Sequence, residues 1–182
     1  MNCWYTEAMR KLTLDTFNEL VVEANIKPRL KTELRFVQST ENLSDEEWAE
    51  RELLAITDRN GNKGVLLVQL DDDFYILPYE MKSGITSSST GRSQSVICDF
   101  CQTWQYGNKS GSISFAKDRK SNVGYLCCED LKCSMHVRNK TPESHTSRAQ
   151  LREDLNIEQR VERLKTRMRG FISELPVEPL HF

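Results

Sequence analysis

Five of the six cysteines lie between positions 98 and 133, which makes a metal site the first chemistry to consider. Cys98 and Cys101 form a C-x2-C pair, and 26 residues separate Cys101 from Cys128 in the second group, "CCEDLKC". A zinc ion prefers four soft or borderline ligands in a tetrahedron, and a C-x2-C turn brings two sulfurs to one ion because its backbone amides curl around them. Two such pairs predict a tetrahedral zinc site.

Two strands and a helix are predicted around the second group of cysteines. "SISFAKD" and "NVGYLCC" have the pattern of a hairpin joined by "RKS", and "EDLKCSMHVR" follows as a helix with Asp130 near its start. A cysteine knuckle, a hairpin and then a helix terminus is the order of elements in a treble-clef finger.

The hairpin decides which of the two adjacent cysteines is the ligand. Alternation along a strand places Cys127 and Cys128 on opposite faces, so only one of them can reach the ion. Cys128 is the closer to the predicted helix, whose first turns contain Cys133. We therefore expect Cys127 to be a buried apolar thiol and the zinc ligands to be Cys98, Cys101, Cys128 and Cys133.

Alternatives for these cysteines stay open on the sequence alone. His136 follows Cys133 by three residues and could replace a cysteine as a ligand, as could Cys127. A C-x2-C redox pair would normally follow a strand of a βαβ unit and would not need the second group. The sequence shows neither an orienting group for a Cys/His nucleophile nor the H-x-E arrangement of a zinc deaminase. We therefore expect a structural zinc and a protein that is not an enzyme.

Apolar periodicity predicts an N-terminal helical segment over residues 1–50. A first helix is indicated over residues 14–24, and Pro28 can begin a second helix that continues to Val37. A capping-box signature at Ser44 predicts a third, short helix.

Residues 51–182 predict an α/β domain, which makes the fold class α+β overall. Three strands, "LLAIT", "GVLLVQL" and "FYILP", form an antiparallel meander whose first turn carries the hairpin signal "NG". The Ser/Thr/Gly-rich residues 83–95 predict a flexible connection to the finger at about 96–140. The longest predicted helix, at about 148–175, has apolar residues along one face and is expected to cover the sheet.

The charge is uneven along the chain, although the net charge is only −2. Residues 1–95 carry 11 Lys and Arg against 16 Asp and Glu, a net of −5, and residues 96–170 carry 14 against 9, a net of +5. The C-terminal half is therefore suited to phosphates or to an acidic protein face. Because the sequence has neither a run of about 20 apolar residues nor a recognisable signal peptide, we expect a cytoplasmic protein with no membrane partner.

"VICDFC" followed by "VGYLCCEDLKCSMHVR" resembles the C-terminal treble-clef zinc finger of the elongation-factor-G-binding proteins, the FusB-like family of fusidic acid resistance. The resemblance spans residues 96–138. It implies an α/β domain with one zinc finger at its edge and binding to the C-terminal domains of elongation factor G. In the resistance members, that binding frees the factor when it is stalled on the ribosome. The residues that carry the resemblance, besides the four expected ligands, are Tyr125, Asp130, Leu131, Ser134, Val137 and Arg138.

We therefore expect a zinc-finger protein that binds elongation factor G and promotes its release from the ribosome, as in fusidic acid resistance. Phe100 stands between two ligands on a tight knuckle, where it is hard to bury completely. The alternative is an RNA- or ribosome-binding zinc-finger protein that uses the arginine-rich C-terminal helix. Acidic residues interleaved in that helix argue against the alternative. The expected partner-binding residues are Phe100, Trp104, Tyr125, Lys132, Arg138 and Phe171.

Overall fold

The computed structural model describes residues 9–24, 26–145 and 154–181. Helices and antiparallel strands confirm the α+β class. The helices are α1 (Leu14–Glu23), α2 (Pro28–Glu33), α3 (Phe36–Thr40), α4 (Asp45–Ala49), α5 (Cys133–Val137), α6 (Pro142–His145) and α7 (Ile157–Ser173), with a 3-10 turn, η1, at Gly107–Lys109. The strands are β1 (Leu53–Thr57), β2 (Lys63–Leu70), β3 (Asp73–Ser83), β4 (Val96–Ile97), β5 (Trp104–Gln105), β6 (Ser110–Ala116) and β7 (Asn122–Cys128).

The N-terminal helices differ from the sequence prediction at one point. The predicted second helix is divided into α2 and α3 because Leu34 has an extended backbone, with ψ at 136°. Arg35 then donates its backbone N–H to the Thr57 carbonyl of β1 at 3.0 Å, and Phe36 stacks on Phe17 of α1 with 4.5 Å between ring centroids. Tertiary contacts with β1 and α1 therefore override the local helical periodicity.

The predicted capping box at the start of α4 is confirmed. The Ser44 hydroxyl accepts a hydrogen bond from the Glu47 N–H at 3.2 Å, and the Glu47 carboxylate accepts one from the Ser44 N–H at 3.0 Å. These bonds satisfy two backbone donors that the first turn of a helix leaves open. The cap fixes a short helix that buries Trp48 against the sheet-facing core.

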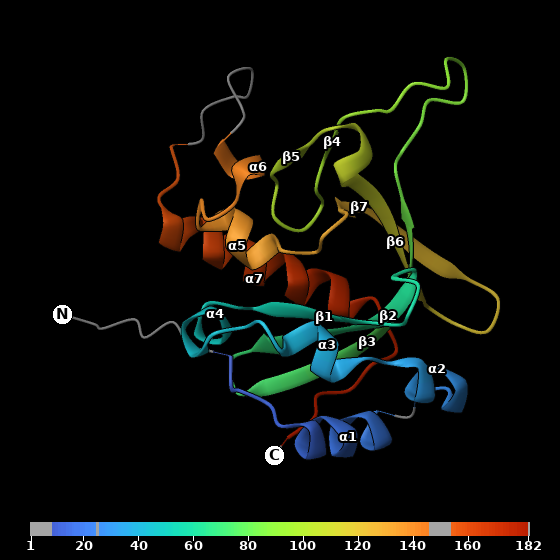
Figure 1. Cartoon of the computed structure of the whole chain (residues 1–182), viewed down its shortest axis with the longest axis vertical. Coiled ribbons are helices and arrows are strands. Elements are labelled where there is room, and N and C mark those ends of the chain that lie inside the picture. Colours follow the sequence, from blue (N-terminus) through green and yellow to red (C-terminus); the bar gives the residue numbers. More distant parts are fainter. Residues whose placement is uncertain (1–8, 25, 146–153, 182) are drawn as a thin grey trace.

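One antiparallel sheet joins the meander to the finger (Figure 1). Its strand order is β1-β2-β3-β6-β7, so the hairpin β6–β7 continues the predicted three-strand meander instead of forming a sheet of its own. This is possible because β3 is 11 residues long: its first part pairs with β2, and its last part, Tyr79–Ser83, pairs with β6. Strand β7, which ends at Cys128, thus lies at one edge of a five-stranded sheet.

Gly64 on β2 allows the sheet to form at its most crowded point. A Cβ atom at this position would lie 2.2 Å from the Ile56 carbonyl oxygen and 3.0 Å from the Tyr79 hydroxyl. Any side chain here would force the backbone of β1 or the Tyr79 ring to move, because real Cβ contacts are not that short. Glycine therefore lets a buried tyrosine ring lie across β2.

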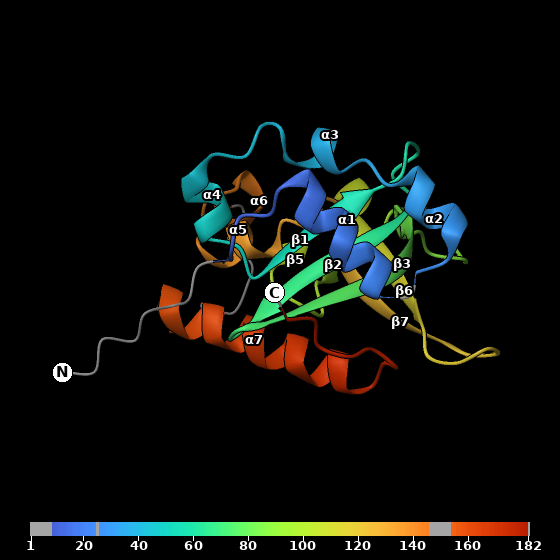
Figure 2. The ribbon, with the colours of Figure 1, turned by 90° about the horizontal axis from the view of Figure 1, so that it is seen from below.

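Both faces of the sheet are covered, by different helices (Figures 1 and 2). This explains why β2 is almost continuously apolar instead of alternating. The N-terminal helices α1, α3 and α4 cover one face, and α7 covers the other, as expected for the long amphipathic helix. The first core includes Phe17, Leu20, Phe36, Trp48, Ile56, Val65, Leu67 and Ile76. The second includes Leu53, Leu66, Leu77, Ile113, Val161, Leu164, Met168 and Ile172.

Helix α7 is shorter than the predicted 148–175. It begins at Ile157 after an Asn156 cap, whose side chain accepts from the Gln159 N–H at 2.8 Å, and it ends at Ser173. Residues 154–156 are not helical, and the earlier part of the predicted helix lies outside the described residues. Among the described helices, none has the length and apolar character needed to cross a bilayer.

Candidate metal centre

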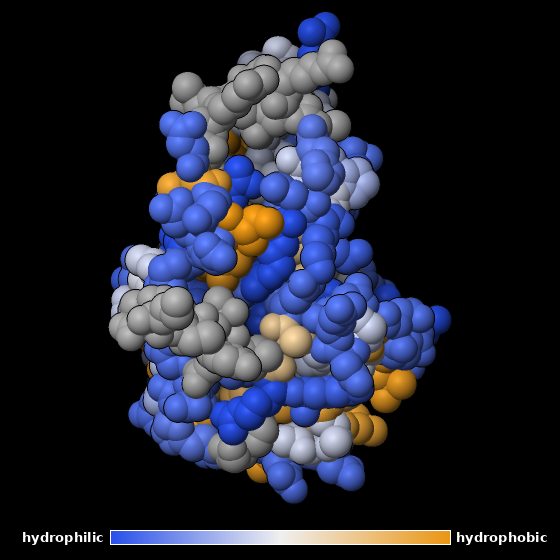
Figure 3. Space-filling view, turned by 90° about the vertical axis from the view of Figure 1, so that its left-hand side faces the viewer, coloured by the Kyte–Doolittle hydropathy of each residue, from blue (hydrophilic) through white to orange (hydrophobic). Residues whose placement is uncertain are grey.

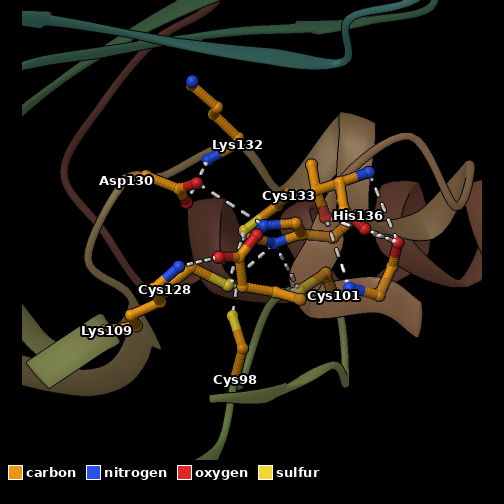
Figure 4. A network of polar contacts seen from close by, with 11 residues as sticks. Cys98, Cys101, Lys109, Cys128, Asp130, Lys132, Cys133 and His136 are labelled. Atoms are coloured by element: carbon orange, nitrogen blue, oxygen red, sulfur yellow. Dashed lines mark hydrogen bonds and ion pairs between the residues drawn. The ribbon is translucent and has the colours of Figure 1, made fainter. Parts of the chain in front are cut away.

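Four cysteine sulfurs meet at one buried point beside the sheet (Figure 4). The Sγ atoms of Cys98, Cys101, Cys128 and Cys133 all lie within 4.8 Å of one another. Neighbouring sulfurs are 3.5 Å apart for Cys101 and Cys128, 3.8 Å for Cys98 and Cys133, and 3.9 Å for Cys128 and Cys133. All four residues are free thiols with at most 2% of their surface exposed.

These distances fit a single zinc ion. Zinc–sulfur bonds of about 2.3 Å in a tetrahedron set neighbouring sulfurs about 3.8 Å apart, which is the spacing found here. Each knuckle thiol has a close contact with the second group: Cys98 lies next to Cys133, and Cys101 lies next to Cys128. Each knuckle thiol thus lies beside a thiol of the second group. A single shared ion requires this arrangement, whereas a redox pair formed by Cys98 and Cys101 alone would not need the second group. The cluster accordingly fits one structural zinc.

The turn between β4 and β5 positions the first two thiols. The Cys98 N–H donates to the Thr103 carbonyl at 3.0 Å, and the Cys98 carbonyl accepts from the Gln102 N–H at 2.9 Å. Gln102 has a left-handed backbone, with φ at 59°, which closes the turn. Asp99 ties the knuckle to β7, because its N–H donates to the Leu126 carbonyl at 2.8 Å.

The junction between β7 and α5 positions the other two thiols. Cys128 is the last residue of β7, and Cys133 is the first residue of α5. Between them the chain reverses through Leu131, whose φ is 49°, and the Asp130 carboxylate accepts the Lys132 N–H at 3.0 Å. The predicted helix over residues 129–138 therefore begins four residues late, because its first residues form this turn.

Cys127 lies outside the four-sulfur cluster. Its side chain is fully buried and its Sγ packs 3.5 Å from the position that a Cβ of Gly111 would take. Burial raises the pKa of this thiol well above its ordinary value, so it stays neutral. Cys127 is therefore the buried apolar thiol that strand alternation predicts.

His136 lies beside the cluster and contacts it through one ring nitrogen (Figure 4). Its Nδ1 is 3.1 Å from the Cys128 Sγ and 3.9 Å from the Cys101 Sγ, while its Nε2 is 3.5 Å from the Asp130 carboxylate. Burial disfavours protonation, but hydrogen bonding with Asp130 and Cys101 raises the pKa of His136 to about 10. Four sulfurs already complete a tetrahedron, so His136 is placed to donate a hydrogen bond to a ligand sulfur.

The thiols also influence the pKa values of one another. Burial opposes ionisation of Cys101, but hydrogen bonds with Cys128, Cys133 and Cys98 hold its pKa well below the ordinary value. The hydrogen bond with Cys101 in turn raises the pKa of Cys128 and of Cys133. Cys101 is thus the thiol whose ionisation its neighbours favour, while ionisation of Cys128 and Cys133 is opposed. A divalent cation supplies the positive charge that allows the remaining thiols to ionise.

Two of the expected partner-binding residues are engaged within the chain, Phe100 by burial and Arg138 by an ion pair. Phe100 is 0% exposed, because the knuckle folds onto α7 and its ring packs 5.3 Å from Phe171 and 6.0 Å from Tyr125 between centroids. The expectation that Phe100 is exposed is therefore wrong. Arg138 is held by Glu52, with Nη1 and Nη2 at 2.9 Å and 2.5 Å from the two carboxylate oxygens. Its guanidinium is thus engaged within the chain.

The other four expected contact residues keep some exposure. Trp104, Tyr125 and Phe171 are partly buried, and Lys132 is exposed. Tyr125 and Phe171 pack against each other with 4.3 Å between ring centroids, so they belong mainly to the core around Phe100. Trp104 and Lys132 remain the better candidates for contact with a partner.

Three features of the site went unpredicted from the sequence. The Asp130–His136 pair was one of them: Asp130 was expected to start a helix, and the only signal for the pair was two polar residues on either side of Cys133. The other two were the exposure of Ile97, at 47%, and of Tyr106, at 43%. A short apolar stretch does not indicate which of its side chains face solvent.

A family model described as FBP C-terminal treble-clef zinc-finger matches residues 25–175. The match extends over the sheet, the cysteine cluster and α7, and it begins within the N-terminal helices. Neither the comparison with curated proteins nor that with solved structures gives a significant match.

Proposed function

The chain belongs to the FBP C-terminal treble-clef zinc-finger family, the FusB-like family of the sequence resemblance, and from that premise we propose that it binds elongation factor G and promotes release of the factor from the ribosome. The role is that of a binding protein, in which zinc holds the contact surface in place. The observation that carries this proposal is an exposed apolar patch on the zinc knuckle.

This knuckle patch consists of Ile97 and Tyr106, which are exposed, and Trp104, which is partly buried. Ile97 and Trp104 are paired residues of β4 and β5, and the Trp104 and Tyr106 rings meet edge to face with 6.3 Å between centroids. Exposed aromatic residues on a rigid support are typical of the residues that dominate protein–protein binding energy. Cys98 and Cys101 supply the support, because they lie in the same turn.

Lys132 adds a positive charge on the finger, at the start of α5. Together with Trp104 it retains part of the surface expected from the sequence, whereas Phe100 is buried and Arg138 is paired with Glu52. A net charge of +5 over residues 96–170 favours an acidic protein face as the partner. We therefore propose that the knuckle patch and Lys132 form the contact with the factor.

The arginines of α7 support RNA binding less well than their number suggests. Arg160 donates to the Asn139 side chain at 3.0 Å, Arg167 to the Asp99 carbonyl at 2.9 Å, and Arg169 to the Asp71 carboxylate at 3.0 Å. On the face that includes the start of α7, hydrophilic side chains predominate and the hydrophobic ones lie in several separate areas (Figure 3). Each of these three arginines is therefore already engaged by another residue of the chain.

Calorimetric titration with purified elongation factor G tests the proposal. Trp104→Ala and Tyr106→Ala should each weaken binding by roughly 30-fold, the loss typical of an interface residue worth about 2 kcal/mol. Val22→Ala is the matched control, because Val22 is an exposed apolar residue of α1 on the other side of the sheet, and it should leave the affinity unchanged. Absence of binding heat at about 50 µM wild-type protein would overturn the proposal, since a micromolar complex would form fully there.

A further inference from the structure

The β6–β7 hairpin extends away from the body of the protein in both ribbon views (Figures 1 and 2). Its last paired residues are Ala116 and Asn122, so the hairpin tip consists of the five residues 117–121, "KDRKS". All five are exposed. The tip is therefore a small, outward-pointing surface that is separate from the zinc knuckle.

Asp118 holds the tip in one conformation. Its Oδ1 accepts hydrogen bonds from the backbone N–H groups of Lys120 at 2.7 Å and Ser121 at 2.8 Å, and its Oδ2 accepts one from the Ser121 hydroxyl at 2.5 Å. The Ser121 hydroxyl and these two N–H groups lower the pKa of Asp118. The one carboxylate of the tip is thus directed inward, onto its own backbone.

The three cations of the tip are left for a partner. Lys117, Arg119 and Lys120 are exposed, and none of them forms an ion pair with any residue that the structure describes. Three cations and one carboxylate leave a net charge of +2 over five residues. A rigid turn that presents several unengaged cations is a preorganised site for anionic groups.

The composition of the tip distinguishes between classes of partner. Protein interfaces owe most of their binding energy to aromatic and apolar anchors. The one apolar side chain in residues 116–122 is the small methyl group of Ala116. The nearest aromatic residue in the strand, Phe115, is buried. Phosphodiester backbones need no apolar anchor, because lysine and arginine bind them by charge and release their counterions.

We propose that the hairpin tip binds the phosphodiester backbone of a nucleic-acid duplex through Lys117, Arg119 and Lys120, without reading its bases. Such contacts position a protein on a duplex and carry no sequence information. The site is distinct from the knuckle patch proposed for the protein partner, so the two surfaces can act at the same time.

Fluorescence anisotropy with a labelled RNA duplex of about 20 base pairs tests the tip, in salt from about 50 to 200 mM. The triple variant K117Q/R119Q/K120Q should raise the dissociation constant at least about tenfold at the low salt concentration. It should also make the plot of log affinity against log salt less steep by roughly 2 to 3, the slope lost with up to three phosphate contacts. A DNA duplex should bind comparably, because the contact is to the backbone.

The matched control is K27Q/R59Q/R92Q, which removes the same charge from three exposed positions elsewhere in the chain. It should retain the wild-type salt slope and most of the affinity, and both triple variants should keep the wild-type melting temperature. Equal losses in the two triple variants would overturn the proposal, because net charge alone would then explain binding. Undetectable binding of the duplex by the wild-type protein, at about 100 µM protein in low salt, would also overturn the proposal. Loss of affinity for elongation factor G in the tip variant, with duplex binding unchanged, would likewise assign the tip to a protein partner.

Discussion

Arg138 at the end of α5 and Glu52 before β1 are 86 residues apart in sequence and form a two-bond ion pair in the protein interior. The same Arg138 guanidinium also donates to the Ser134 carbonyl at 3.0 Å. The Ser134 hydroxyl in turn accepts the N–H groups of Glu52 at 3.0 Å and Leu53 at 3.4 Å. The serine and arginine of the finger motif therefore fasten the helix of the finger to the edge strand of the sheet.

The Arg138–Glu52 pair should contribute strongly to stability. Arg138→Ala leaves the nearly buried Glu52 carboxylate without its partner, and breaking such a pair typically costs about 3–5 kcal/mol. Urea denaturation measures this as a lower free energy of unfolding. Lys140→Ala is the control, because it removes the exposed Lys140–Glu50 pair and should cost no more than about 1 kcal/mol. Equal costs for the two variants would show that Arg138 does not anchor the finger.

Ser134→Ala tests the second contact of the same anchor. The variant leaves the N–H groups of Glu52 and Leu53 without the hydroxyl as their acceptor in a buried location, which should cost about 1–3 kcal/mol. Hydrogen exchange of these two amides should accelerate more than that of amides in the centre of β2. Unchanged exchange at Glu52 and Leu53 would contradict the role given to Ser134.

The zinc cluster could be predicted from the sequence because its information is local. Cys98 and Cys101 lie within one short turn, and so do Cys128 and Cys133, so their spacing indicates that the two groups of thiols converge. Strand alternation also separates Cys127 from Cys128, and the structure places Cys127 away from the cluster. Where neighbouring residues determine the geometry, spacing is sufficient.

Residues whose surroundings come from distant segments could not be assigned in this way. Phe100 is buried because α7, about 70 residues later, brings Phe171 against the knuckle. The division between α2 and α3 depends on β1, through the bond from Arg35 to Thr57. Arg138 was expected to contact a partner protein, because no residue near it in the sequence indicates its ion pair with Glu52. These errors share one cause, which is long-range packing that a single sequence does not display.

One zinc per chain is expected, and its loss should unfold the finger. Cys101→Ser removes a ligand from a site that typically supplies about 10–16 kcal/mol of apparent binding energy near neutral pH. Elemental analysis should find about one equivalent of zinc in the wild type and in Cys127→Ser, and little in Cys101→Ser. Loss of the metal from Cys127→Ser would show that Cys127, not Cys128, is the ligand.

The pKa of Asp118 should be visibly low in an NMR titration of its carboxyl carbon. Because this pKa is lower in the folded protein than in the unfolded chain, the associated stability is present above about pH 4 and is lost as the pH falls through the folded-state value. Ser121→Ala removes the hydroxyl that lowers the pKa most, so the midpoint should move up toward the ordinary value for aspartate. An unshifted midpoint in this variant would mean that the turn is not held by Ser121.

The N-terminal segment, residues 1–50, should not be removable from the rest of the chain. Its helices cover one face of the sheet, where Leu54, Ile56, Val65 and Leu67 are all at most 4% exposed. Exposing a buried side chain of this size costs about 1.5–3 kcal/mol, so the four together approach the whole stability of a typical domain. A chain of residues 51–182 should therefore bind a hydrophobic dye and lose dispersed amide signals in NMR spectra.

Limited proteolysis of the full chain complements the truncation. The first cuts should fall within residues 84–95, which are mostly exposed and lie outside the sheet, and the nicked protein should keep its zinc because the four thiols lie on the C-terminal side of the cut. Residues 157–173 of α7 should resist cleavage, since Leu164 and Met168 are almost fully buried against the sheet. Early cutting within α7, or a well-folded truncated chain, would contradict the shared core described above.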